Sequence, residues 1–186
     1  MRAFLAIDLV PELKASMEAL IRQVRAGARG TKWVEPQGMH LTLKFLGWIS
    51  EDGAASVESG IREIVGNRPP FRIRLRGTGT FPPGWKKNAR VLWVGIDEDP
   101  GLMSLQKDME TALEKLDFAP EDRPFHPHLT LGRVKTPEGL DRILANLEKH
   151  RDADFGDMPV SSITLFESVL GRSGAEYKPL AEVPLS

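Results

Sequence analysis

The stretch M-H-L-T-L at residues 39–43 recurs almost unchanged as P-H-L-T-L at residues 127–131. In a β-strand, residues two positions apart point to the same face, while the residues between them point to the other face. The leucines of each copy would therefore face a hydrophobic core. Each copy predicts a strand with an imidazole beside a hydroxyl on one polar face: His40 with Thr42, and His128 with Thr130.

Two such strands facing each other would form a cleft with rough two-fold symmetry, and this set of groups suits a phosphate. The hydroxyls can donate hydrogen bonds to the non-bridging oxygens, while one imidazole removes a proton and the other supplies one. A single histidine on a strand is usually an ordinary core or surface residue. The duplication with matching threonines favours catalysis instead.

Strand-like and helix-like stretches alternate along the rest of the chain. Strands are expected at residues 2–9, 39–46, 71–76, 90–96, 126–134, 160–170 and 177–183, helices at 13–24, 50–65, 102–116 and 140–147, and a turn at 171–174. Several strands follow one another with only a loop between them, which disfavours a parallel, doubly wound sheet. We expect an α+β fold with largely antiparallel sheets, in one domain spanning residues 1–186.

Composition excludes several classes of function. The 186 residues contain no cysteine and carry a net charge of −1, so a thiol nucleophile, a thiolate metal site and a large sequence-blind DNA-binding surface are all disfavoured. No apolar stretch approaches the roughly 20 residues of a membrane span. The first apolar run meets Asp8 too early for a secretion signal. We expect a cytoplasmic protein without a membrane partner.

Two other catalytic designs deserve comparison. His126 and His128 form an H-x-H pair that could be part of a zinc site, but no carboxylate is in register with them, and we expect no metal. A serine hydrolase is disfavoured because no serine lies in a G-x-S-x-G elbow.

The chain resembles the two-histidine (2H) phosphoesterases, and within them the RNA 2′,3′-cyclic phosphodiesterases, also called 2′-5′ RNA ligases. The resemblance covers nearly the whole chain. It rests on R-A-F-L-A-I-D-L (2–9), K-W-V (32–34), H-L-T-L-K-F-L-G (40–47), R-V-L-W-V-G-I (90–96), P-F-H-P-H-L-T-L-G-R-V (124–134) and L-F-E-S-V-L (165–170) before Tyr177. One departure is His126, where relatives often carry arginine.

This resemblance implies two pseudo-symmetric lobes, each an antiparallel sheet with helices outside, facing a central active-site cleft. It implies hydrolysis of 2′,3′-cyclic phosphate ends of RNA, tRNA fragments among them, to 2′-phosphomonoesters, with reverse 2′-5′ ligation. No metal, nucleotide cofactor or obligatory protein partner is implied. By the family pattern His40 is the proton donor and His128 the proton acceptor, with Thr42 and Thr130 holding the phosphate.

Further side chains could contact the substrate. Lys44 shares a strand face with His40 under strict alternation, whereas Arg133 reaches the cleft only if its strand ends or bulges near Gly132. Aromatic candidates for base stacking are Phe125, Trp33 and Trp48. A basic surface for RNA, or a merely solvated face, is formed by Arg72, Arg74, Arg76, Lys86, Lys87 and Arg90.

Two alternatives to RNA-end hydrolysis stay open. One is a phosphodiesterase for small cyclic or 2′-5′-linked nucleotides, such as cyclic ADP-ribose phosphates or 2′-5′ oligoadenylate. The other is a non-catalytic module that binds nucleotides or RNA in the same cleft. Two intact His-x-Thr motifs argue against the second alternative.

Overall fold

A computed structural model describes residues 1–172 and 174–186. Ser173, part of the expected turn, lies outside the described residues. The elements in chain order are β1 (Arg2–Asp8), α1 (Pro11–Val24), β2 (Thr31–Trp33), the 3-10 turn η1 (Pro36–Gly38), β3 (His40–Trp48), α2 (Glu51–Val65), β4 (Phe71–Phe81), β5 (Val91–Ile96), α3 (Pro100–Glu114), β6 (His128–Val134), α4 (Leu140–Glu148), β7 (Asp154–Val160), β8 (Ser162–Gly171) and β9 (Gly174–Pro184).

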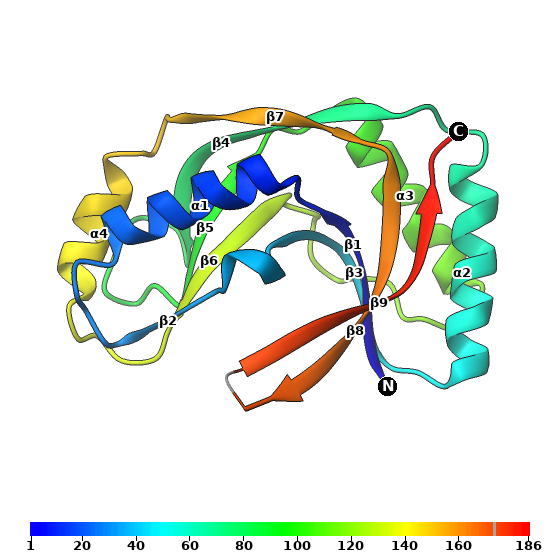
Figure 1. The fold of residues 1–186 in the computed structure, drawn as a ribbon, viewed down its shortest axis with the longest axis horizontal. Coiled ribbons are helices and arrows are strands. Elements are labelled where there is room, and N and C mark those ends of the chain that lie inside the picture. Colours follow the sequence, from blue (N-terminus) through cyan, green and yellow to red (C-terminus); the bar gives the residue numbers. More distant parts are fainter. Residues whose placement is uncertain (173) are drawn as a thin grey trace.

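The strands form two antiparallel sheets. Sheet A has the order β3-β1-β8-β9, and sheet B has the order β2-β6-β5-β4-β7. Helices α2 and α3 lie at one end of the molecule beside sheet A, and α1 and α4 lie at the other end beside sheet B (Figure 1). The expected α+β architecture, with one H-x-T strand in each sheet, is confirmed.

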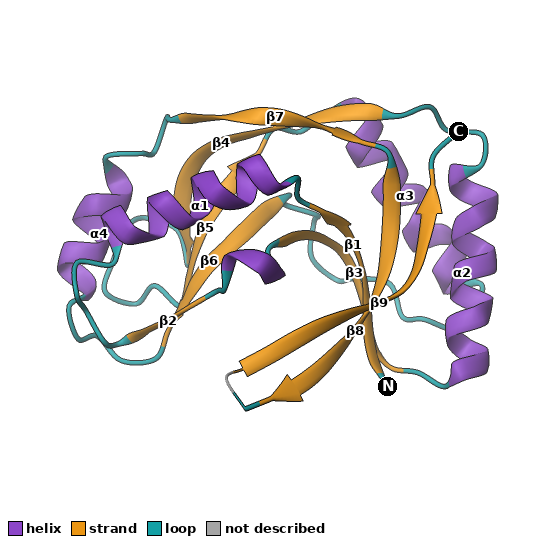
Figure 2. Cartoon of the chain, viewed as in Figure 1, coloured by secondary structure: helices purple, strands orange, loops and turns teal. Residues whose placement is uncertain are grey.

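The helices that follow β1 and β5 each contact a strand of the opposite sheet. Helix α1 begins after a strand of sheet A but contacts α4 and β7, whereas α3 begins after a strand of sheet B and contacts α2, β3 of sheet A and β4 of sheet B (Figure 2). The two lobes are therefore interlaced. Among the described residues, no helix combines the length and the apolar composition that a bilayer span requires.

Local sequence explains where several elements begin and end. Ser50 caps α2, because its hydroxyl accepts a hydrogen bond from the Gly53 amide at 3.0 Å.

The sequence did not predict β7, because Gly156 and Pro159 are unfavourable within strands. At the edge of sheet B a proline is tolerated, since its missing amide is not needed for a ladder. Strand β2 was also missed as an element, because three residues give no periodicity.

Candidate active site

Both motif histidines stand at the first position of their strands. His40 pairs across the sheet with Asp8 of β1, and His128 pairs with Gly95 of β5. The leucines that follow them, Leu41 and Leu129, are buried in the main core, as the alternation predicted. Strands β3 and β6 contact each other across the two sheets. Each imidazole therefore lies on the face of its sheet that is turned away from the core.

Each imidazole is held by the carbonyl two residues earlier in the chain. The Nδ1 atom of His128 lies 2.6 Å from the His126 carbonyl oxygen, and the His40 ring donates a hydrogen bond to the Gly38 carbonyl. A carbonyl oxygen only accepts, so the Nδ1 atom of His128 carries the proton of that bond. The Nε2 atom is then left to exchange a proton with a substrate.

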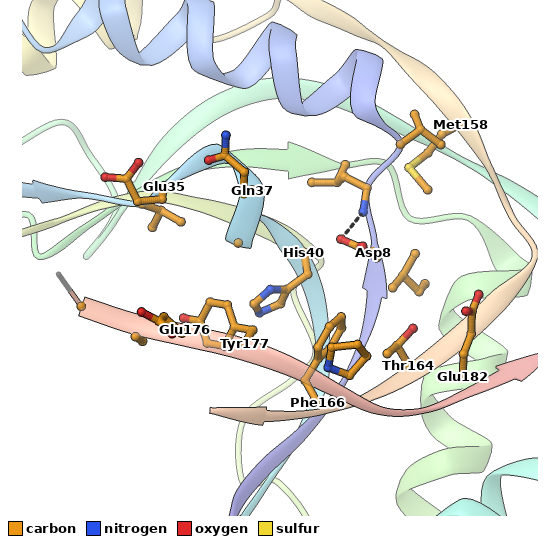
Figure 3. Close-up of a pocket in the computed structure, with 18 of the residues that line it drawn as sticks. Asp8, Glu35, Gln37, His40, Met158, Thr164, Phe166, Glu176, Tyr177 and Glu182 are labelled. Carbon is orange, nitrogen blue, oxygen red and sulfur yellow. Dashed lines mark hydrogen bonds between the residues drawn. The ribbon is translucent and has the colours of Figure 1, made fainter. Parts of the chain in front are cut away.

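Aromatic rings pack around the two histidines. The His40 ring stacks on Phe4 with a centroid distance of 4.6 Å. It also meets the ring of Tyr177 edge-to-face at 4.9 Å (Figure 3). His128 meets Phe81 edge-to-face at 5.1 Å. These rings restrict rotation of each imidazole, and they also remove water from around it.

The loss of water has an electrostatic consequence for both histidines. Burial lowers the pKa of His40 to about 4, against the smaller raising effects of the Gly38 carbonyl and the Asp8 carboxylate. Burial also lowers the pKa of His128, and the positive charge of Arg133 adds to this shift. Both imidazoles are therefore neutral near pH 7 in the free protein, because desolvation disfavours the charged form.

A bulge in each motif strand changes which side chains share a face. Pairing with β1 and β5 shows that Leu43 of β3 and Leu131 of β6 are extra residues. Beyond the bulge, Arg133 lies opposite Val91 and returns to the face of His128 and Thr130. The condition under which the sequence allowed Arg133 to reach the cleft is thus met.

The same displacement makes the prediction for Lys44 wrong. Lys44 lies opposite Leu5, on the core side of sheet A rather than beside His40. Its ammonium is buried, bonds the Glu110 carboxylate at 2.8 Å and donates to the Ala119 carbonyl at 2.6 Å. Lys44 is therefore a structural cation and does not face the substrate side of sheet A.

A cavity of about 830 Å³ adjoins His40. It is bounded by β1, by the segment around β2, and by the β8–β9 hairpin, and its lining includes Arg133, Lys32 and Tyr177. Figure 3 shows His40 and Tyr177 turned toward each other in this cavity. Among the described residues, the lining includes neither His128 nor the two threonines.

Of the remaining predicted contacts, one aromatic residue lines the cavity, and the others lie elsewhere or are paired. Phe125 packs against the core and does not line the cavity among the described residues, so its substrate contact stays a prediction. Trp33 lines the cavity, whereas Trp48 is 82% exposed at the far end of β3. The arginines of β4 form ion pairs with aspartates: Arg72 with Asp157, Arg74 with Asp154, and Arg76 with Asp97.

Some features of the site were missed by sequence reasoning. Phe4 and Tyr177, which hold the His40 ring, occur in or beside the family-like strings but gave no signal of a role. Lys32 was noted only as part of K-W-V, and Lys135 was not noted. In residues 1–172 and 174–186, no three His, Asp or Glu side chains gather as a metal site.

Comparisons with known proteins agree with this geometry. A relative from Aeropyrum pernix is 40% identical over 153 residues, covering 82% of this chain and 85% of its own. A relative from Archaeoglobus fulgidus is 36% identical over 183 residues, covering 97% and 98%. Both are named RNA 2′,3′-cyclic phosphodiesterase.

Solved structures show the same fold. The crystal structure of TT0787 of Thermus thermophilus matches with a TM-score of 0.83 and 31% identity, covering 100% of this chain and 98% of that one. Escherichia coli LigT complexed with 3′-AMP matches with a TM-score of 0.78 and 25% identity, again covering 100% and 98%. A sequence model described as the 2′-5′ RNA ligase superfamily matches residues 11–172. The chain therefore belongs to the 2′-5′ RNA ligase superfamily.

Proposed function

We propose that the protein hydrolyses 2′,3′-cyclic phosphate ends of RNA, tRNA fragments among them, to 2′-phosphomonoesters. The observation that carries the proposal is the matched pair of H-x-T strands, one in each sheet, with each imidazole bonded to the carbonyl two residues earlier. Relatives at 36% and 40% identity named RNA 2′,3′-cyclic phosphodiesterase support the same reaction.

In the proposed reaction, the Nε2 atom of His128 takes a proton from water as the water oxygen bonds to phosphorus. The bond from phosphorus to the 3′ oxygen breaks in line, and protonated His40 gives its proton to that oxygen. Thr42 and Thr130 donate hydrogen bonds to the non-bridging oxygens. After product release, proton exchange with solvent restores His40 and His128. With a 5′-hydroxyl in place of water, the same step forms a 2′-5′ bond: His128 takes the proton of the 5′-hydroxyl as its oxygen bonds to phosphorus, and the 3′ oxygen leaves with the proton from His40.

The low pKa of His40 is compatible with an acid that is charged only when substrate is bound. An anionic phosphate beside an imidazole favours its protonated form, so substrate binding raises the pKa of the histidine it contacts. Arg133 lies on the same face as His128 and Thr130 and adds positive charge there. This charge helps to hold the substrate phosphate, and it also keeps His128 neutral as a base.

A defined substrate tests the proposal. Purified protein is incubated with a 2′,3′-cyclic-ended oligoribonucleotide in excess chelator, and the product is identified as the 2′- or 3′-phosphomonoester. We expect the 2′-phosphomonoester as the product, formed at the same rate with chelator as without it. Loss of turnover that zinc restores would instead favour metal chemistry at His126 and His128. A cytoplasmic location, where RNA substrates are available, is part of the proposal.

Small nucleotides are a second candidate substrate class. The Escherichia coli relative binds 3′-AMP, and the cavity beside His40 has the size of a small-molecule site. Assays with a cyclic mononucleotide and with 2′-5′ oligoadenylate separate this candidate from RNA-end hydrolysis. Binding of either nucleotide without turnover would favour a non-catalytic module.

A further inference from the structure

The cavity is placed on one side of the catalytic pair. Its lining includes His40 but, among the described residues, not His128. The two motif strands are otherwise alike in position, carbonyl bond and bulge. The large open space therefore distinguishes the two histidines, although the repeated sequence motif does not.

In-line hydrolysis assigns this space to one part of the substrate. This assignment of the space rests on the proposed function, in which His40 protonates the departing 3′ oxygen. That oxygen belongs to the terminal ribose, so the nucleoside and the RNA chain attached to its 5′ side lie on the side of His40. The attacking water lies on the opposite side of phosphorus, near His128, and needs little space. The cavity thus suits the terminal nucleoside and the RNA upstream of it.

Cations line one wall of this cavity. Arg133 of β6, Lys135 just after it and Lys32 of β2 are all in the lining, and Lys32 is the cross-strand neighbour of Arg133. None of the three takes part in an ion pair within residues 1–172 and 174–186. The arginines of β4 are paired with aspartates, so the cavity wall keeps charge that the β4 surface has neutralised.

Carboxylates line other parts of the cavity: Asp8 at the end of β1, which is paired with Lys14, Glu35 just after β2, and two residues of β9. Glu176 and Glu182 of β9 line the cavity, and Glu182 accepts a hydrogen bond from the Ser162 hydroxyl at 2.7 Å. The Lys32 ammonium reaches toward β9 and lies 3.5 Å from where a Cβ of Gly174 would be. Repulsion from the β9 carboxylates and attraction to Arg133, Lys135 and Lys32 would direct the phosphates of an RNA chain along the β2–β6 wall.

We propose that Lys32 and Lys135 bind the backbone phosphates upstream of the cyclic end, and that the enzyme therefore prefers oligoribonucleotides to cyclic mononucleotides. Arg133 lies nearest to His128 and serves the reacting phosphate. The two lysines continue the positive charge away from it. Phosphate contacts of this kind carry no base specificity, so the preference is for chain length and not for sequence.

The test compares kcat/KM for a cyclic mononucleotide with kcat/KM for otherwise equal substrates extended upstream by one and two nucleotides. For the wild-type protein, kcat/KM should rise when the substrate gains its first upstream phosphate. In Lys32→Met and Lys135→Met, the ratio of oligomer to mononucleotide should fall about fivefold, the upper end for an exposed ion pair. Lys32→Arg should retain the ratio, because it keeps the charge. Lys107→Met, on the exposed surface of α3, is the matched control and should change nothing.

Binding provides a readout that does not depend on turnover. Fluorescence anisotropy measures binding of a 2′-phosphate-ended oligomer at several salt concentrations. The slope of the logarithm of the binding constant against the logarithm of the salt concentration should become shallower by roughly 0.7 for each lysine removed. The proposed phosphate binding by Lys32 and Lys135 (the phosphate track) would be overturned by either of two results. One is equal wild-type kcat/KM for the mononucleotide and the oligomers; the other is an unchanged oligomer-to-mononucleotide ratio in both lysine variants. If neither substrate is hydrolysed, the proposed function fails. The track is then judged on binding alone, and is rejected if both lysine variants bind like wild type.

Discussion

Lys44 of β3 holds the carboxylate of Glu110 of α3 at 2.8 Å, with the lysine side chain only 4% exposed. Glu110 also accepts a hydrogen bond from the Glu121 amide at 3.3 Å. The pair therefore connects a strand of sheet A with the loop that leads into β6 of sheet B. The connection is one-sided, because the position that corresponds to Lys44 in β6 is Gly132.

Removing one partner of this pair should destabilise the fold. We expect Lys44→Met to lower the free energy of unfolding by up to about 3–5 kcal/mol, the scale for a fully buried pair, because it leaves the half-buried Glu110 carboxylate without its ammonium partner. The matched control is Arg22→Met in the exposed pair with Glu18, which should cost about 0.5 kcal/mol or less. Urea denaturation measures both variants. The double variant Lys44→Met/Glu110→Leu should recover part of the stability lost in Lys44→Met. Equal losses of stability in Lys44→Met and in the control Arg22→Met would refute the prediction.

The pH dependence of kcat/KM should be bell-shaped, with both limbs below about pH 6.5. Burial lowers the pKa of His40 to about 4 and also lowers the pKa of His128, and kcat/KM reports the free enzyme. In the pH profile of kcat, the alkaline limb should lie at higher pH than in the profile of kcat/KM, because the bound phosphate raises the pKa of the acid. Limbs of kcat/KM above pH 7 would contradict the desolvated site.

The single histidine variants identify which limb belongs to which group. His40→Ala should remove the alkaline limb and His128→Ala the acidic limb, each with a loss of about 10²–10⁴ in kcat. The double variant should be little worse than the poorer single one, because the two groups act as a unit. A histidine whose removal leaves kcat and the bell unchanged is not catalytic.

The threonines should matter through phosphate oxygens and not through proton transfer. Thr42→Val or Thr130→Val should reduce kcat by about 10²–10³, the scale for one transition-state hydrogen-bond donor, while the shape of the pH profile is retained. Thr111→Val on the exposed surface of α3 is the control. Wild-type rates in both motif variants would make the threonines structural.

Folding stability should fall as the pH drops from about 6.5 toward 4. In this window an unfolded histidine is protonated, whereas the lowered pKa keeps His40 neutral in the fold, so the unfolded state binds more protons. Thermal unfolding followed against pH should show a shallower decline in His40→Gln than in wild type. His150→Gln, in the turn between α4 and β7, is the control. Parallel declines in wild type and His40→Gln would exclude this linkage.

Sequence periodicity placed the histidines and threonines, because each pair lies before the bulge in its strand. It failed for Lys44 one residue beyond Leu43, since a bulge is fixed by pairing with a neighbouring strand and not by the strand's own residues. The same kind of displacement, at Leu131, brought Arg133 to the cleft. The cavity wall depends on cross-strand contacts between Lys32 and Arg133 and on the β8–β9 hairpin, which local patterns do not reveal.

The contacts of α1 and α3 with strands of the opposite sheets make the two histidine strands inseparable. A fragment that ended between β4 and β5 would contain β3 without α3, the helix that carries the carboxylate partner of Lys44. The complementary fragment would contain β7 and α4 without α1, which packs on both. Neither fragment would contain the helix that covers its own strands, so neither could bury its hydrophobic core. Duplicated though its motif is, the protein cannot work as two exchangeable modules, and its active site assembles only when the entire chain folds.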